Sequence, residues 1–375
     1  MRKIGLISFH KDPNYGTMYQ AYALAKAIEK LGCVAEYIEY EPIQKRSIFI
    51  TVVKKIVKRI LSVLGLYKGP ITEYSFFKSK EFKVLKSKYR DFHQKYIPTS
   101  KNTYYANTIF DSENAYDLFI VGSDQTWSSF CNTNINTPNY LSFIKDSKKK
   151  RAYAPSLGSV HITDEYKKKL RLELSDFEYL SCREYENSKM LSVFLNKEVK
   201  HVLDPTLLLS SDEWSFIEQP IKMPEHYVLC YILGTKKCIS DFAEKLGQTK
   251  GYPVYYIVTR PEYFSKKNAL KDVAPEQFLY LLRNASYVVT DSFHGSVFSV
   301  NFNRNFYSFA KRETKDSTGI DNDRIMDFLS LLGLQNRFIY DNEMRLEEDI
   351  CFSEINKIVK LNKESSIKYL KSIIF

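Results

Sequence analysis

The sequence lacks the features that mark exported, membrane-spanning and disulfide-rich proteins. After Met1-Arg2-Lys3 the apolar run lasts only to about Phe9, which is too short for the core of a signal peptide. No stretch approaches the roughly 18 uncharged apolar residues that a membrane-spanning helix needs. The six cysteines are scattered, with no Cys-x-x-Cys pair and no cluster with histidine at metal-ligand spacing. We therefore expect a soluble cytoplasmic protein with reduced thiols, no disulfide framework and no bound metal ion.

The sequence also lacks the motifs by which nucleotides and nucleic acids are commonly bound. It has neither the three-glycine dinucleotide fingerprint nor the lysine of a P-loop, so neither NAD nor a nucleoside triphosphate is supported. A zinc finger, an RNA-binding signature and a long basic arm are missing too, which argues against nucleic acid as a partner. The net charge of +11 favours an anionic partner, such as a phosphate-bearing substrate or an acidic lipid headgroup.

The length and the apolar pattern predict two α/β domains. At 375 residues, 44% of them apolar, the chain exceeds what one hydrophobic core usually serves. Its first forty residues have the pattern of a strand, a helix and a second strand. Strand-like runs separated by loops or helical spacing then follow, at 118–121, 151–154, 179–182, 227–231, 253–258, 287–290 and 306–309. This alternation predicts parallel sheets with helices on both faces.

We place the domain boundary near Pro205, where one α/β series ends and another begins. The first domain covers 1–205 and the second 206–349, and a helix over 350–375 is a candidate to pack back on the first domain. A helical insertion is expected near 45–101. Its first part, 45–66, has an apolar strip opposite a lysine- and arginine-rich face. That strip either lies flat on an anionic membrane surface or packs on the protein's own core.

The segment from Tyr287 to Gly295 carries the most informative chemistry. A short apolar strand delivers Asp291 and His294 to a tight turn that begins a helix. A helix N-terminus offers unpaired backbone N–H groups and a positive dipole end, which suit a phosphate or carboxylate. Histidine is the side chain most easily poised for proton transfer near neutral pH. The alternative interpretation is that Asp291 caps the helix and His294 is a structural, hydrogen-bonded residue.

Two further strand ends predict contacts to a ligand, one of them to a sugar. Asn14-Tyr15-Gly16 lies in the loop after the first strand, where doubly wound folds place their ligands, although Gly16 is equally explained as a turn residue. After the strand that ends at Val121 come Asp124, Gln125 and Trp127. A carboxylate and an amide hold sugar hydroxyls while an indole covers a ring face, and we prefer this interpretation to helix capping.

Arginines at other strand ends predict contacts to an anion. Arg183 follows the strand over 179–182 and should project into the same cleft, where its planar group can grip a carboxylate or phosphate. A local salt bridge to a neighbouring carboxylate is the alternative. Arg312 and Arg324, further along the chain, either complete an anion cradle or belong to a basic surface.

Six short motifs occur in a specific order along most of the chain: Asn14-Tyr15-Gly16 with Gln20-Ala21-Tyr22-Ala23-Leu24, Val121-Gly122-Ser123-Asp124-Gln125, Ala154-Pro155-Ser156-Leu157-Gly158, Ser181-Cys182-Arg183-Glu184, Leu203-Asp204-Pro205-Thr206 and Thr290-Asp291-Ser292-Phe293-His294-Gly295. In this order they resemble the polysaccharide pyruvyl transferases. The resemblance implies two Rossmann-like domains arranged as in glycosyltransferase-B enzymes. It also implies transfer of a pyruvyl group from phosphoenolpyruvate to sugar hydroxyls as a ketal, without a further cofactor.

The resemblance and the residue chemistry together assign the site. Arg183 and His294 match a family arginine and histidine at the donor, whereas Ser292-Phe293 stand where several members have Arg-Leu. We expect proton transfer and acceptor orientation from His294, Asp291 and Asp124. The expected donor contacts are Arg183, Ser292, Phe293, Gly295, Ser296, Arg312 and Arg324, and the expected acceptor contacts are Asn14, Tyr15, Gly16, Gln125 and Trp127.

The expected acceptor is a surface polysaccharide or its lipid-linked precursor at the cytoplasmic face of the membrane. Two alternatives remain open from the sequence: a nucleotide-sugar glycosyltransferase of the same architecture, and a glycan-binding protein that keeps the fold without catalysis.

Overall fold

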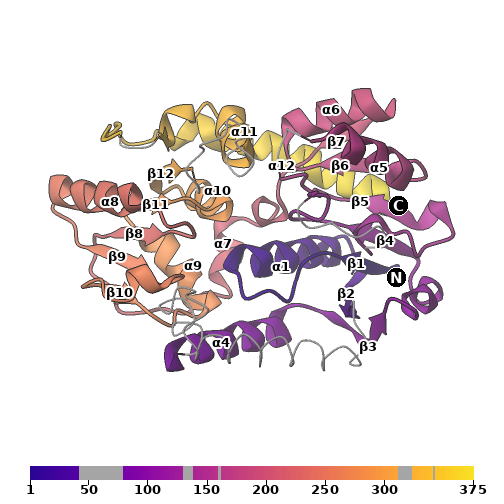
Figure 1. Cartoon of the computed structure of the whole chain (residues 1–375), viewed down its shortest axis with the longest axis horizontal. Coiled ribbons are helices and arrows are strands. Elements are labelled where there is room, and N and C mark those ends of the chain that lie inside the picture. The colour runs from indigo at the N-terminus through magenta and orange to yellow at the C-terminus, as the bar shows by residue number, and fades with distance from the viewer. Residues whose placement is uncertain (42–78, 130–137, 159–161, 311–322, 341–342) are drawn as a thin grey trace, which may run out of the picture.

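The computed structural model describes residues 1–41, 79–129, 138–158, 162–310, 323–340 and 343–375. The described chain forms two α/β halves, each built on a parallel sheet (Figure 1). The predicted basic helix over 45–66 and Arg312 lie outside the described residues. Among the helices that are described, none is both long and apolar enough to cross a bilayer.

The first half is built on a five-stranded sheet in the order β3-β2-β1-β4-β5, with every neighbouring pair parallel. Its strands are β1 (Lys3–Ile7), β2 (Val34–Glu41), β3 (Thr99–Tyr105), β4 (Leu118–Val121) and β5 (Lys150–Ala152). A two-stranded parallel sheet of β6 (Leu180–Cys182) and β7 (Val199–His201) continues it through a bridge between Arg151 and Tyr179. The helices of this half are α1 (Tyr15–Lys30), α4 (Lys80–Tyr96), α5 (Asp164–Leu174) and α6 (Tyr185–Leu195).

The second half is built on a six-stranded parallel sheet in the order β10-β9-β8-β11-β12-β13. Its strands are β8 (Val228–Tyr231), β9 (Val254–Ile257), β10 (Ala269–Leu270), β11 (Tyr287–Thr290), β12 (Asn305–Phe309) and β13 (Phe338–Ile339). The short helix α7 (Ser211–Ser215) precedes this sheet, and the helices α8 (Lys237–Lys250), α9 (Pro275–Asn284), α10 (Phe293–Asn301) and α11 (Asp323–Leu331) accompany it.

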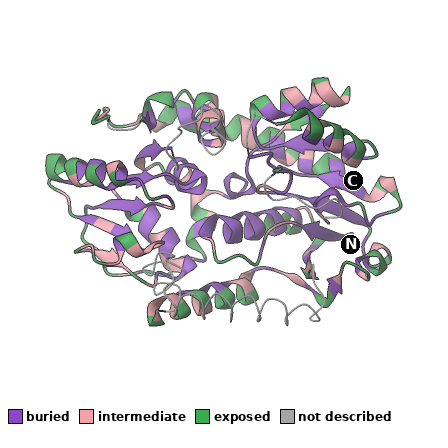
Figure 2. Cartoon of the chain, in the orientation of Figure 1, coloured by how far each residue is buried: buried purple, intermediate pink, exposed green. Residues whose placement is uncertain are grey.

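Alternate residues of the central strands enter different cores, which explains why these strands are apolar throughout. In β8, Val228 and Cys230 pack in a cluster with α8, whereas Leu229 and Tyr231 join a cluster with α9 and α10. A parallel strand that is buried on both faces has no polar face to present. Figure 2 shows the central strands and α1 almost wholly buried, with exposed residues gathered on the outer helices. The predicted α/β fold with parallel sheets is confirmed.

The last helix, α12 (Phe352–Ile374), lies against the first half (Figure 1). The Ser366 hydroxyl accepts a hydrogen bond from the Leu203 amide at 2.9 Å, and the Tyr369 hydroxyl donates to the Ala152 carbonyl at 3.0 Å. Arg151 Nε donates to the Ile373 carbonyl at 3.1 Å, and the Arg2 guanidinium donates to the Ile374 carbonyl. The first and the last elements of this chain therefore belong to the same half.

The two halves share one hydrophobic core, in which aromatic residues of α1 meet those of the second half. Tyr15 stacks on Phe278 with 4.0 Å between ring centroids, and Tyr19 packs against Phe298 at 5.1 Å. The hydroxyl of Tyr15 donates to the Val273 carbonyl at 2.7 Å. These contacts fix α1 against α9 and α10, and so hold its N-terminus beside the second half.

Candidate active site

A cavity of about 440 Å³ lies between the two halves. Its walls come from the loops that follow β1 and β4 in the first half, and from the loops that follow β8 and β11 in the second, with α11 closing one side. These are carboxyl ends of parallel strands, where open α/β sheets bind their ligands. The charged and hydrogen-bonding residues of the wall are Asp12, Asn14, Thr17, Asp124, Gln125, Asp291, Ser292, His294 and Arg324.

The N-termini of α1 and α10 meet at this cavity. Asn14 caps α1 by accepting a hydrogen bond from the Thr17 amide at 3.3 Å, and Ser292 caps α10 by accepting from the Gly295 amide at 3.3 Å. Gly16 lies directly against the imidazole of His294, so closely that a Cβ atom at position 16 would collide with the ring. Two positive helix ends therefore face one cavity, and glycine at 16 is what permits the contact.

Behind the cavity, Arg183 and His294 converge on the carboxylate of Asp204. Arg183 Nη1 lies 2.8 Å from Asp204 Oδ2, and His294 Nε2 lies 3.6 Å from the same oxygen. The other oxygen, Oδ1, accepts from the amide and the hydroxyl of Thr206 at 3.0 and 2.7 Å. An acidic side chain that is almost fully buried thus joins the arginine of the first half to the histidine of the second.

The charges of this cluster stabilise one another. Burial by itself raises the pKa of Asp204, but His294, Arg183 and the Thr206 amide outweigh it and hold the pKa well below its ordinary value. Burial likewise lowers the pKa of Arg183, and the nearby carboxylates of Asp204, Glu184 and Asp124 more than compensate. Within the described part of the chain, Arg183 Nη2 and His294 Nε2 have no hydrogen-bond partner.

Arg183 does not line the 440 Å³ cavity, contrary to the expectation that it projects into the cleft. Its guanidinium lies over the ring of Phe293, 4.3 Å from the centroid, and lines a separate space of only about 10 Å³. Phe293 and Arg324 border both spaces. Arg183 is held away from the cavity partly by its neighbour, because Arg183 Nε donates a hydrogen bond to Glu184 Oε1 at 3.3 Å. This is the local salt bridge that the sequence leaves open as an alternative.

The carboxylates expected at the site have different partners. Asp124 lines the cavity in a left-handed backbone conformation, with φ of 66°, and accepts a hydrogen bond from the Thr17 hydroxyl at 3.3 Å. Burial, with a contribution from Asp124, raises the pKa of Asp12 beside it. Asp291 accepts from the amides of Leu233 and Gly234 at 2.6 Å each, so it holds the loop that follows β8.

The structure does not bring every predicted residue to the cavity. Trp127 is fully buried and donates from its indole to the Asn139 carbonyl at 3.1 Å, so its ring is part of the core and presents no face to a sugar. Tyr15 is buried in the contact between the halves. The Ser296 hydroxyl is bonded to that of Ser308 at 2.7 Å, and Gly295 packs closely against Thr290.

The sequence does not reveal Asp204 as a site residue. It stands in the motif Leu203-Asp204-Pro205-Thr206, where an aspartate before proline is typical of a turn. Its burial and its contacts to Arg183 and His294 depend on segments far apart in the chain. The one available signal was that its motif belongs to the same ordered set as those of Arg183 and His294.

Comparison with known proteins decides the family. The sequence model of the polysaccharide pyruvyl transferase family matches residues 14–311. The chain belongs to this family. The match contains Asp124, Arg183, Asp204 and His294, whereas Arg324 and α12 lie beyond it. No curated protein sequence matched this pyruvyl transferase family member.

Solved structures of low sequence identity align with most of this chain. The UDP-GlcNAc 2-epimerase from Methanocaldococcus jannaschii aligns with a TM-score of 0.52 and 11% identity over 96% of this chain and 91% of its own. That from Neisseria meningitidis, bound to UDP-GlcNAc, aligns with a TM-score of 0.46 and 11% identity over 97% and 100%. At this identity the likeness concerns the fold alone. The pyruvyl transferase chain has two Rossmann-like domains in the glycosyltransferase-B arrangement.

Proposed function

We propose that this member of the family transfers the pyruvyl group of phosphoenolpyruvate to two hydroxyls of a saccharide, forming a ketal and releasing phosphate. The observation that carries the proposal is the meeting of the N-termini of α1 and α10 at one cavity, with His294 between them. A proton-transferring side chain beside two positive helix ends suits a donor that must be protonated while its phosphate departs.

The reaction assigns a task to each group. His294 gives a proton to the methylene carbon of phosphoenolpyruvate, which leaves an oxocarbenium-like centre at the neighbouring carbon. A sugar hydroxyl attacks this centre and passes its proton to the carboxylate of Asp124. The bond to the phosphate oxygen then breaks, and the phosphate departs with the proton held by Asp124. A second hydroxyl attacks the carbon that the phosphate has left, gives its proton to the now neutral His294 and closes the ketal. Asp204 stabilises the protonated imidazole, and Arg183 holds Asp204 in place.

The acidic wall supports a saccharide as the acceptor. Asp12, Asp124 and Gln125 lie on the side of the cavity that belongs to the first half. Carboxylate and amide oxygens accept hydrogen bonds from sugar hydroxyls, and a carboxylate can also remove the proton of the attacking hydroxyl. We propose that the donor occupies the end near α10 and Arg324, and the acceptor the end near Asp12 and Asp124. A lipid-linked or surface polysaccharide, reached through the basic segment 45–66, is the acceptor we propose.

The test is a donor assay with purified protein. Phosphate release from phosphoenolpyruvate should require an acceptor glycan, and the product should carry the methyl signal of a pyruvate ketal in its proton NMR spectrum. Release of a nucleoside diphosphate from an activated sugar would instead identify a glycosyltransferase. Glycan binding without turnover of either donor would identify a non-catalytic binding protein. The membrane contact is tested separately, by co-sedimentation with anionic and neutral vesicles.

A further inference from the structure

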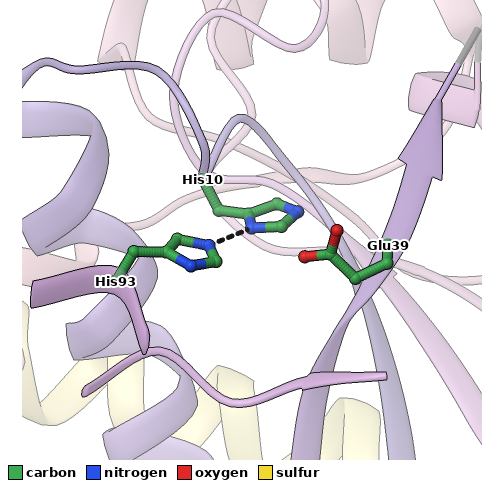
Figure 3. A group of neighbouring side chains, drawn as sticks. All are labelled: His10, Glu39 and His93. Carbon is green, nitrogen blue, oxygen red and sulfur yellow. Dashed lines mark hydrogen bonds between the residues drawn. The ribbon is translucent and has the colours of Figure 1, made fainter. Parts of the chain in front are cut away.

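Two histidines and a glutamate from distant parts of the sequence meet at one point of the first half (Figure 3). His10 comes from the loop after β1, Glu39 from β2 and His93 from α4. His10 Nδ1 lies 2.9 Å from His93 Nε2, and one ligand atom of each of the three residues lies within 4.8 Å of the others. Neither histidine lines the cavity described above.

Both imidazoles are held with their ring nitrogens directed at each other. His10 is buried and stacks on Tyr37, with 5.0 Å between ring centroids. The His10 ring also forms a hydrogen bond with the backbone of Ile38. Such a bond is typical of a histidine whose other ring nitrogen is a metal ligand. Burial, with smaller effects of His93 and Lys11, lowers the pKa of His10 to about 3, and burial also lowers the pKa of His93.

A cation already pairs with the third member of the group. The Lys11 ammonium forms an ion pair with Glu39 Oε2, and the Lys11 side chain is 38% exposed. Because the Lys11 side chain is partly exposed, its ammonium can turn toward water and release the carboxylate. A metal ion that binds at Glu39 therefore takes the place of the Lys11 ammonium.

We propose that His10, Glu39 and His93 bind a Zn²⁺ ion. Two imidazole nitrogens and one carboxylate oxygen are a ligand set that zinc uses, whereas Ca²⁺ and Mg²⁺ prefer oxygen ligands alone. Zinc takes the place of the hydrogen bond between the two rings, and the proton of that bond moves to the other nitrogen of the donor ring. Water completes the coordination from the partly exposed side of His93 and Glu39.

The site gives the ion a structural role that is distinct from pyruvyl transfer. It ties α4 to the loop after β1, the loop that also carries Phe9 and Asp12 of the cavity wall. At its other side α4 contacts the second half, where Lys88 pairs with Asp272 at 3.0 Å. A bound ion thus fixes three elements to one another, β2, α4 and the loop after β1.

The test uses the full chain, stripped of metal by a chelator and titrated with zinc chloride in a calorimeter. One ion per chain should bind. His93→Gln and Glu39→Gln should each weaken zinc binding at least about 10-fold. That factor is a lower bound, because removing a group that only supports a metal ligand already costs about 10-fold in affinity. The matched control is His226→Gln, which alters an exposed histidine 4.0 Å from Glu225 and should leave binding unchanged.

A second measurement on the unaltered chain keeps the test decisive even where a variant folds poorly. Titration with Co²⁺ should give the visible absorption of a nitrogen-ligated ion, and added Zn²⁺ should abolish that absorption. Absence of stoichiometric binding by the unaltered chain, or equal binding by the folded His93→Gln and Glu39→Gln variants, would overturn the proposal. Neither measurement involves phosphoenolpyruvate, so the result is independent of the proposed transfer reaction.

Discussion

At the scale of single residues, the site depends on a buried chain of alternating acidic and basic side chains. Glu184, Arg183, Asp204 and His294 lie in contact or near contact, and each residue restricts where its neighbour can point. A charge buried in this way is tolerated only when it is paired. We infer that the cluster orients His294 toward the cavity.

The first prediction concerns His294→Gln. Glutamine keeps a polar side chain of similar size but cannot donate a proton to carbon, so phosphate release from phosphoenolpyruvate should fall about 10²- to 10⁴-fold. The rate is measured at saturating donor and acceptor. His226→Gln is the control, because His226 is exposed and distant from the cavity. A His294→Gln rate within about twofold of the unaltered protein would contradict the assignment of the proton donor.

The second prediction concerns Gly16→Ala. Alanine is the better helix former by about 1 kcal/mol, so in open space the change would stabilise α1. Here its methyl group would collide with the His294 ring and displace it. We expect the rate of phosphate release to fall about 10²-fold, because a small misplacement of a catalytic group has an effect of this size. The variant should still fold.

The control for Gly16→Ala is Gly333→Ala. Gly333 has a positive φ and open space around it, so that variant carries backbone strain without touching the site. Full activity of Gly16→Ala would show that the imidazole does not need its present position.

The sequence alone predicts some of the residues of this buried cluster. Arg183 and His294 follow apolar strands and belong to ordered motifs, so their importance was predicted. Their partner Asp204 was not, because the burial of a carboxylate depends on a fold that brings three segments together. The prediction for Trp127 is wrong for the same reason. The sequence does not distinguish an indole that faces a cavity from one that is buried in the core, and Trp127 is fully buried.

At the scale of elements, one helix end adds a polar contact between the halves. The side chain of Asp327 in α11 accepts hydrogen bonds from the amides of Tyr185 and Glu186 at 2.8 and 3.0 Å. These amides begin α6, so a carboxylate of the second half caps a helix of the first. A negative side chain at a helix N-terminus stabilises the helix, but burial opposes its ionisation.

The third prediction concerns Asp327→Asn and pH. Burial raises the pKa of Asp327 to about 6, despite the two backbone N–H groups that lower it. The folded carboxyl thus holds its proton more tightly than the unfolded chain does. Its contribution to stability is therefore full at low pH and is lost as the pH rises through about 6.

Urea unfolding of the unaltered protein and the variant between pH 4 and 7 measures this contribution. The free energy difference between the two should change by about 1.4 kcal/mol for each pH unit between the two pKa values. Glu225→Gln, at an exposed side chain, serves as the control. A difference that is constant with pH would contradict the prediction.

The elements themselves were predictable where burial leaves a continuous apolar run. The predicted strands at 118–121 and 287–290 coincide with β4 and β11. The strand β3 was not predicted, and its residues up to Lys101 were assigned to a helical insertion. This strand lies at the edge of its sheet and reads Thr-Ser-Lys-Asn-Thr-Tyr-Tyr, so no apolar run marks it.

At the scale of the whole molecule, the two halves act as one packed body because their cores are continuous. Tyr15 and Tyr19 of α1 lie in the same cluster as the helices of the second sheet, and α12 joins that cluster from the other end of the sequence. Domains with so large an apolar contact are expected to unfold together.

The fourth prediction concerns Leu370→Ala in α12. Leu370 is fully buried in the shared core, so its truncation should lower the free energy of unfolding by about 2–5 kcal/mol. Leu361 is on the same helix and is 67% exposed, and Leu361→Ala should change stability by about 0.5 kcal/mol or less. Urea denaturation of both variants provides the comparison. Equal effects would mean that α12 is not needed to complete the first half.

The return of α12 also sets the order in which the protein is completed during its synthesis. A ribosome makes β1 before the second sheet. The helix α12, whose Ser366 and Tyr369 bond to Leu203 and Ala152, leaves the ribosome only after β8 to β13. Until then, the apolar surface that α12 will cover stays open on the nascent chain. We expect the growing first half to depend on the second sheet, or on a chaperone, to avoid aggregation during this interval.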